Sequence, residues 1–221
     1  MKKTWILTAA ICATIIISPT RNEALGMDST DTTSTSLDIS AALPEIGNPA
    51  PAIMSQDTNG KNVDLSLYKG KIVVLEWTNN GCPFVKKHYG SKNIQAVQKD
   101  AADKGVVWIS VVSSAPGKEG NVTADEANKI TADAGAVITH KILDPDGKIG
   151  HAYGAKTTPH LFVIAADGTI AYMGAIDDQS SPDPQTVKGA KNYVRAAIDS
   201  LIAGTPVETT QTQPYGCGVK Y

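Results

Sequence analysis

Cys82 is the residue of this sequence best placed for chemistry of its own. It follows a continuous apolar run, residues 71–77, and stands directly before Pro83, where a segment with helical character begins. The thiolate is the reactive form of cysteine, and the N-terminus of a helix stabilises that negative charge. Proline suits the first turn of a helix, because no backbone N–H is needed there. Cys82 is therefore predicted to be a nucleophilic thiol with redox chemistry.

Cys217, near the C-terminus, is a second thiol that could take part. Gly216 and Gly218 flank it and would let the backbone approach another segment closely. A flexible run of about a dozen residues spans roughly 20 Å, enough to reach across a small domain. Cys217 could therefore resolve an oxidised Cys82 by forming a disulfide with it. A permanent structural disulfide and an unpaired thiol are the two alternatives.

Glu76 is the one acid in the apolar run that precedes Cys82. Burial disfavours a carboxylate, so a buried Glu76 would have a raised pKa and could relay protons. The alternative is a position at the strand edge, with the side chain in solvent.

Metal binding is the other chemistry to weigh. Cys82 with His88 and His160 would offer thiolate and imidazole ligands that suit copper, but a second nearby cysteine is missing. We therefore expect no metal and no cofactor. His88 is predicted on a helix surface, His160 at the start of a strand, and Lys86-Lys87 on a solvated helix face.

The elements that position these residues follow an α/β order. Two continuous apolar runs, 71–77 and 106–112, predict strands buried on both faces. A predicted helix over 83–104 joins them and ends at Gly105. Strand, helix and parallel strand in this order form a right-handed βαβ unit.

The second half of the chain adds a hairpin and a last helix. Asp167-Gly168 lies between two short apolar runs, which predicts an antiparallel β-hairpin. The other predicted elements are a helix that opens at the capping box Thr123 to Glu126, a strand over 138–143, a helix over 186–203, and a tail from Gly204 without regular structure.

This order of elements, with two short motifs, resembles the thioredoxin fold. Asn-Gly-Cys-Pro-Phe-Val at 80–85 lies where thioredoxins carry their redox motif. Thr157-Thr158-Pro159 precedes the hairpin, as the family's Thr-Pro does, in which the proline is cis. The resemblance covers about residues 45–204 and is closest to redoxins and peroxiredoxin-like proteins with a single cysteine in the motif. It implies a three-layer α/β fold with a mixed central sheet.

The resemblance also implies roles for individual residues. Pro83, Thr158 and Pro159 would bind an extended substrate backbone, and Glu76 would be the buried acid beneath the active cysteine. Such relatives also carry a Gly-Cys-x-Val-Lys tail, here 216–220. The implied activity is that of a thiol-disulfide oxidoreductase or a peroxiredoxin-like antioxidant enzyme. Its substrate would be a protein disulfide or a peroxide, and a thioredoxin-like donor would be its reducing partner.

The departures from these families restrict that reading. Val85 replaces the second cysteine of the thioredoxin motif, so a dithiol cycle within one motif is impossible. Leu75 and Asn79 fill the positions where peroxiredoxins have proline and threonine, and Arg195 is not where their peroxide-binding arginine lies. A typical fast peroxidase is therefore not expected. The alternative is a non-catalytic polypeptide-binding module held by a structural disulfide between the two cysteines.

The N-terminal residues carry the pattern of an export signal. Two lysines precede an apolar run over 5–17 that is shorter than the about 20 residues needed to cross a bilayer. Small residues follow at 24–26, so we predict a secretory signal over 1–26, with a retained anchor as the alternative. A secreted or periplasmic location, where disulfides persist, follows from this prediction, with no membrane insertion after cleavage.

The remaining chain divides into three predicted parts. Residues 27–44 are rich in Ser, Thr and Asp and are expected to form a disordered spacer. A thioredoxin-like domain over 45–204 and a cysteine-containing tail over 205–221 follow. The formal net charge of -2 gives no reason to expect nucleic acid or an anionic membrane as a partner.

Overall fold

The computed structural model of this chain describes residues 43–221. The expected signal, 1–26, and nearly all of the expected spacer, 27–44, lie outside the described residues. Among the helices of the described part, none is long and apolar enough to span a membrane.

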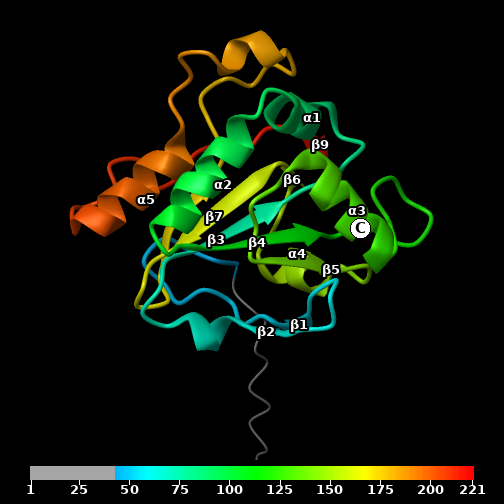
Figure 1. Ribbon diagram of the computed structural model, residues 1–221. Coiled ribbons are helices and arrows are strands. Elements are labelled where there is room, and N and C mark those ends of the chain that lie inside the picture. The colour runs from blue at the N-terminus through cyan, green and yellow to red at the C-terminus, as the bar shows by residue number, and fades with distance from the viewer. Residues whose placement is uncertain (1–42) are drawn as a thin grey trace, which may run out of the picture. The chain divides into compact units, whose positions relative to one another are not determined.

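A five-stranded mixed sheet forms the centre of the domain (Figure 1). Its strands lie in the order β5-β4-β3-β7-β8, with bounds His140–Leu143, Val107–Val112, Val73–Trp77, His160–Ile164 and Ile170–Gly174. β3, β4 and β5 run parallel, whereas β7 and β8 are antiparallel to their neighbours. The predicted βαβ unit and hairpin are therefore both present, on either side of β3.

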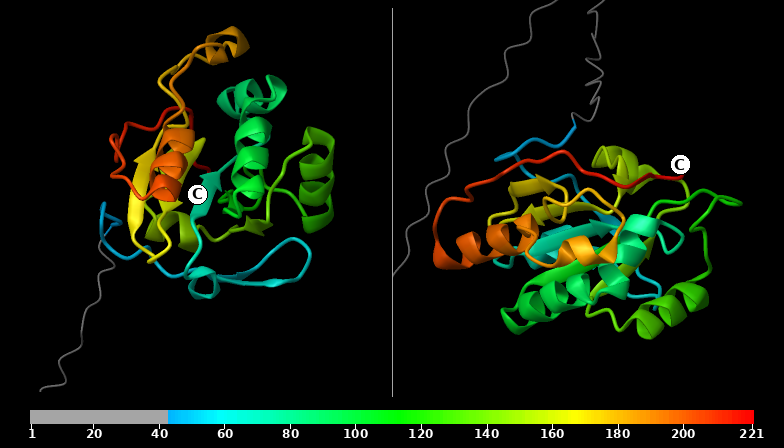
Figure 2. Two further views of the ribbon diagram at one scale, coloured as in Figure 1. Left: turned by 60° about the vertical axis from the view of Figure 1, so that its left-hand side comes forward. Right: turned by 90° about the horizontal axis from the view of Figure 1, so that it is seen from above.

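Helices cover both faces of this sheet and complete three layers (Figure 2). One face carries α1, α2, α3 and α5, with bounds Pro83–Gly90, Asn93–Asp103, Ala124–Ala134 and Tyr193–Ala203. The other face carries α4, Lys148–Ala152, and the hairpin of β1, Met54–Gln56, and β2, Asn62–Asp64, followed by the 3₁₀ helix η1, Leu65–Tyr68. The predicted three-layer α/β fold is confirmed.

The alternation of side chains along β3 divides the core into two clusters. Val74 faces α2 and α5 and packs with Trp108, Ile94 and Ile198. Leu75 and Trp77 point to the opposite side and pack with residues that include Tyr153 and Phe162. Because successive residues of a strand face opposite ways, burial on both faces explains why this run is continuously apolar.

Two predicted helices are shorter than expected. The helix predicted over 83–104 is divided at Lys92, whose φ of 62° is left-handed, and becomes α1 and α2. The helix predicted over 186–203 begins only at Tyr193, because Asn192 caps it by accepting a hydrogen bond from the Arg195 N–H. Before it lies a separate 3₁₀ turn, η2, Pro184–Val187. The apolar spacing continued across both breaks, so periodicity could not reveal them.

The tail is more regular than predicted. A short strand β9, Cys217–Gly218, pairs antiparallel with β6, Thr157–Thr158. Before it, the amide of Thr212 donates to the carbonyl of Met173, 3.1 Å away, in the edge strand β8. After it, the Lys220 carbonyl accepts from the Ala115 amide at 2.7 Å. The tail, red in Figure 1, therefore runs along the domain and is bonded to it over most of its length.

Candidate active site

Cys82 lies at the junction between β3 and α1. It has an extended backbone, with φ −66° and ψ 124°, and Pro83 is the first residue of the helix. Asn79 shapes the loop before it: its side-chain oxygen accepts from the Gly81 amide at 2.8 Å, and its carbonyl accepts from the Cys82 amide at 3.1 Å. The Asn79 amide group donates to the Glu119 carbonyl at 3.0 Å, which ties the loop to its neighbour. Asn79 therefore positions the cysteine, a role the sequence did not indicate.

The loop of Thr158 and Pro159 faces this cysteine. The peptide bond between them is cis, as the resemblance implies. The Cys82 thiol donates to the Thr158 carbonyl at 3.0 Å. Residues 76 positions apart in the sequence thus share one site.

Cys217 approaches the same carbonyl from the tail. In the antiparallel pairing of β6 with β9, Cys217 is the partner of Thr158. Both cysteines are free thiols, and no disulfide joins them in the structure. Cys82 is fully buried, whereas Cys217 is partly accessible. The structure therefore places Cys82, Thr158, Pro159 and Cys217 side by side.

The two thiols of this site differ in acidity. Burial by itself would raise the pKa of Cys82, but hydrogen bonds, first among them those from Cys217 and the Val85 amide, outweigh it and lower the pKa below 9.0. Burial raises the pKa of Cys217 to about 11, and its hydrogen bond to Cys82 acts in the same direction. Cys82 is consequently the more acidic thiol of the pair, and Cys217 is the less acidic one.

Glu76 lies in the core of the domain. Its carboxylate accepts from the Trp108 indole at 2.8 Å, the Tyr89 hydroxyl at 3.0 Å and the Gln98 amide at 3.2 Å. The residue is only 1% exposed, so the alternative of a solvent-facing edge glutamate is wrong. Burial raises its pKa, against the effect of these donors. No hydrogen bond of the described residues joins Glu76 to Cys82.

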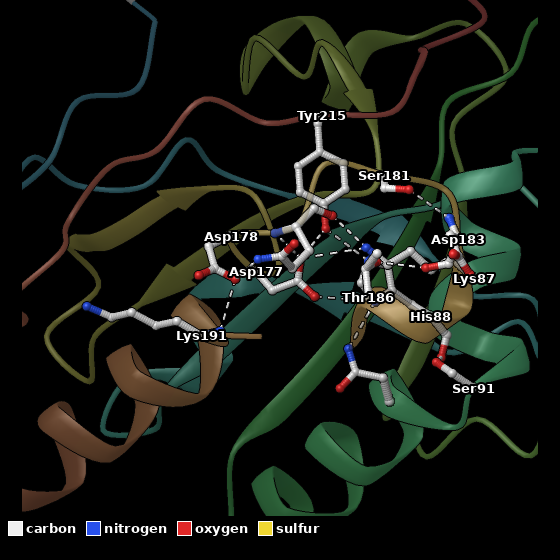
Figure 3. Close-up of polar contacts among 12 residues, drawn as sticks. Lys87, His88, Ser91, Asp177, Asp178, Ser181, Asp183, Thr186, Lys191 and Tyr215 are labelled. Atoms are coloured by element: carbon white, nitrogen blue, oxygen red, sulfur yellow. Dashed lines mark hydrogen bonds and ion pairs between the residues drawn. The ribbon is translucent and has the colours of Figure 1, made fainter. Parts of the chain in front are cut away.

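A buried polar cluster beside the site was not predicted (Figure 3). It consists of Lys87 and His88 from α1, Asp177 after β8, and Tyr215 from the tail. The positions predicted for His88, on a helix surface, and for Lys87, on a solvated face, are wrong, because both side chains are at most 1% exposed. The tail covers that face of the helix, and no signal in the helix sequence itself reveals the cover.

Hydrogen bonds in this cluster run in one direction. The Asn93 amide group donates to His88 Nδ1 at 2.9 Å, which leaves the proton on Nε2. His88 Nε2 then lies 3.1 Å from the Tyr215 hydroxyl, and that hydroxyl donates to Asp177. Burial lowers the pKa of His88 to about 4, so its imidazole is neutral at pH 7. The cluster fixes Tyr215 two residues before Cys217.

His160, predicted at the start of a strand, is the first residue of β7. Burial lowers its pKa to about 4. Within residues 43–221, no three side chains of His, Cys, Asp or Glu are grouped as a metal site would require.

Comparison with known families identifies the family of this chain. Residues 45–193 match the Redoxin family, which is more than half of the sequence. The chain belongs to the Redoxin family. No curated protein matches this redoxin significantly.

Solved structures share the fold of this redoxin. An uncharacterized conserved protein from Geobacillus kaustophilus has a TM-score of 0.70 and 25% identity, over 81% of this chain and 94% of that one. A hypothetical protein from Sinorhizobium meliloti has a TM-score of 0.68 and 23% identity, over 80% and 94%. A protein from Bacteroides thetaiotaomicron, provisionally named a protein disulfide isomerase, has a TM-score of 0.51 and 21% identity, over 72% and 91%.

Proposed function

We propose that this redoxin is an exported thiol-dependent oxidoreductase in which Cys82 attacks a disulfide or a peroxide and Cys217 resolves the product. The observation that carries the proposal is the placement of an acidic, buried Cys82 and a less acidic Cys217 against the same Thr158 carbonyl. Membership in the Redoxin family supports a thiol redox function of this kind.

With a disulfide substrate, the reaction proceeds in two exchanges. The Cys82 thiolate attacks one sulfur, breaks the substrate S–S bond, and releases one substrate thiolate, which leaves a mixed disulfide. Cys217, after losing its proton to that leaving thiolate, attacks the Cys82 sulfur, breaks the mixed disulfide and releases the second substrate thiolate, which takes a proton from water. The substrate gains two electrons, and the chain is left with a disulfide between Cys82 and Cys217.

With a peroxide substrate, the first step differs. The Cys82 thiolate attacks one oxygen and breaks the O–O bond, which gives a sulfenic acid and releases hydroxide or an alkoxide, which takes a proton from the solvent. The Cys217 thiol condenses with that sulfenic acid, forms the same disulfide and releases water. In both cases an external dithiol, such as a thioredoxin-like donor, reduces the disulfide and restores the two thiols.

A coupled turnover assay tests this proposal. Thioredoxin and its reductase would supply electrons from NADPH, and hydrogen peroxide or a small disulfide would be the substrate. We expect activity in the wild type, none above background in Cys82→Ser, and arrest after one turnover in Cys217→Ser. Equal activity in the wild type and Cys82→Ser would exclude the oxidoreductase function and leave the non-catalytic polypeptide-binding module.

The same Cys217→Ser variant separates a resolving role from a structural one. If turnover persists while the melting temperature of the oxidised protein falls, Cys217 serves only as a staple. Export is tested separately, by cell fractionation and mass measurement of the mature N-terminus, which we expect near residue 27.

A further inference from the structure

A cavity lies between α1 and α3, on the face of the sheet that carries both helices (Figure 2). Its volume is about 180 Å³. An apolar cavity of about 150 Å³ is large enough to hold benzene. Neither Cys82 nor Cys217 is among its lining residues, so the cavity is separate from the thiol pair. Its walls are mostly apolar, which suits a small molecule with an apolar body, and they include Val85, Val112, Val122 and Ile130.

Lys141 of β5 reaches into this cavity from the sheet. The residue is 9% exposed, and its ammonium donates to the Thr131 hydroxyl at 3.1 Å. That hydroxyl donates in turn to the Ala127 carbonyl at 2.8 Å, so Lys141 has a neutral acceptor in place of a counter-ion. No carboxylate of residues 43–221 forms an ion pair with this ammonium. An ammonium can donate several hydrogen bonds, so donors remain for a ligand in the cavity.

Glu76 is the carboxylate whose charge acts on Lys141, but it does not pair with it. The register of β3, β4 and β5 places Glu76, Ser110 and Lys141 in one row across the sheet, with Ser110 in the middle. The Glu76 oxygens already accept hydrogen bonds from side chains of α1, α2 and β4. Burial lowers the pKa of Lys141, and attraction by Glu76 opposes this. Because a buried charge without a direct partner is costly, an anion beside Lys141 would be stabilised.

The charged groups of the lining also favour an anion. They are Lys141 inside the cavity and the exposed Lys86 beside it, and the lining contains no aspartate or glutamate. One buried cation compensates a single negative charge, whereas a dianion such as phosphate would stay partly uncompensated. Apolar walls favour a carboxylate with an apolar body over a fully hydrated one such as acetate.

We propose that this cavity binds a small apolar monocarboxylate, whose carboxylate pairs with Lys141 and whose body packs against Val122 and Ile130. The ligand needs neither cysteine. The site therefore stands or falls independently of the proposed oxidoreductase function.

An NMR titration of the chain with benzoate tests this site, in a buffer without other carboxylates. The methyl signals of Val122 and Ile130 should shift and saturate with a Kd of about 1 mM or below. The methyl signal of Ile202, on α5 and outside the cavity, should not move. Benzamide has the same shape without the charge, and we expect it to bind at least about tenfold more weakly.

Lys141→Met tests the cation. It removes the charge and keeps a long side chain, so benzoate should bind at least about tenfold more weakly, with little change for benzamide. Lys129→Met is the matched control, because Lys129 lies on the same helix, α3, as part of the cavity wall, but its side chain is 75% exposed. It should bind benzoate as wild type does.

A second variant keeps the test usable if Lys141→Met does not fold. Ala134 lines the cavity on α3, and Ala134→Leu fills part of the space, so it should weaken benzoate and benzamide alike. The comparison of the two probes on wild type needs no variant at all.

Three results would overturn the proposal. They are equal affinity of wild type for benzoate and benzamide, wild-type affinity for benzoate in Lys141→Met, and no shift of the Val122 and Ile130 signals by roughly 10 mM benzoate. Cys82→Ser, which removes the proposed turnover, should bind benzoate as wild type does. Loss of turnover and loss of binding are therefore distinct outcomes.

Discussion

At the scale of single residues, the division of acidity between the two thiols is the basis of the proposed chemistry. From the sequence, the position of Cys82 at the N-terminus of a helix is the one feature that predicts an acidic thiol. The structure adds specific hydrogen-bond donors, first among them Cys217 and the Val85 amide, and these hydrogen bonds outweigh the cost of burial. Cys217 could not be ranked against Cys82 from the sequence, because its pKa depends on where the tail docks.

The pH dependence of alkylation, followed by mass spectrometry at each cysteine, tests this division. Cys82 should become reactive with a midpoint below 9.0, and Cys217 only with a midpoint near 11. Cys217→Ala should raise the Cys82 midpoint, because a hydrogen-bond donor is lost. Two ordinary and equal midpoints would contradict the assignment of nucleophile and resolving thiol.

The hydrogen bonds of Glu76 should contribute to the free energy of unfolding. Replacing its carboxylate in Glu76→Gln leaves one acceptor oxygen for the donors of Trp108, Tyr89 and Gln98. We expect a loss of about 1–3 kcal/mol in the free energy of unfolding at pH 7, measured by chemical denaturation. Glu45→Gln, at a surface position, is the control and should change it little.

The stability of wild type relative to Glu76→Gln should also depend on pH. The folded protein binds the Glu76 proton more tightly than the unfolded chain, since burial raises the pKa above 4.5. The advantage of wild type should therefore be largest below pH 4.5 and should fall as pH rises toward the folded pKa. If the stability advantage of wild type grows as pH rises over this interval, folding lowers the pKa of Glu76 instead.

At the scale of elements, the sequence predicted the parts whose patterns are local. The continuous runs of β3 and β4, the Thr123 capping box and the Asp167-Gly168 hairpin all lie where expected. The division at Lys92 and the β9 strand were missed. Both depend on tertiary contacts: a left-handed residue between two packed helices, and a two-residue strand that exists only beside β6.

The Tyr215 contact should control how firmly β9 docks. Tyr215→Phe removes a hydroxyl bonded to Asp177 and His88, which should weaken docking by about 2 kcal/mol, or roughly 30-fold. Hydrogen exchange of the Val219 and Ala115 amides, both bonded across the tail junction, should accelerate accordingly.

Tyr193→Phe is the matched control for this experiment. The Tyr193 hydroxyl makes no hydrogen bond to any described residue, so these amides should keep their wild-type rates. If Tyr215→Phe exchanges no faster than Tyr193→Phe, the polar cluster does not hold the tail.

At the scale of the whole molecule, oxidation should link the junction of β3 and α1 to the C-terminal tail. Most of the fold lies between Cys82 and Cys217, so a disulfide there closes a loop of well over 100 residues. Chain-entropy arguments give roughly 4–5 kcal/mol of stabilisation for a loop of that length. The oxidised protein should unfold at a higher denaturant concentration than the reduced one. Cys217→Ser should show no such difference. If oxidised and reduced wild type unfold at the same denaturant concentration, the disulfide is strained or does not form.

Peptide mass mapping without reductant is the most direct test of the central claim, that Cys82 reacts and Cys217 captures it. The mature protein would be mapped untreated and after brief exposure to dilute peroxide. We predict free thiols before treatment and a single Cys82–Cys217 disulfide afterwards, within one chain. Unmodified cysteines, or Cys82 oxidised to a sulfinic acid beside a free Cys217, would contradict the account.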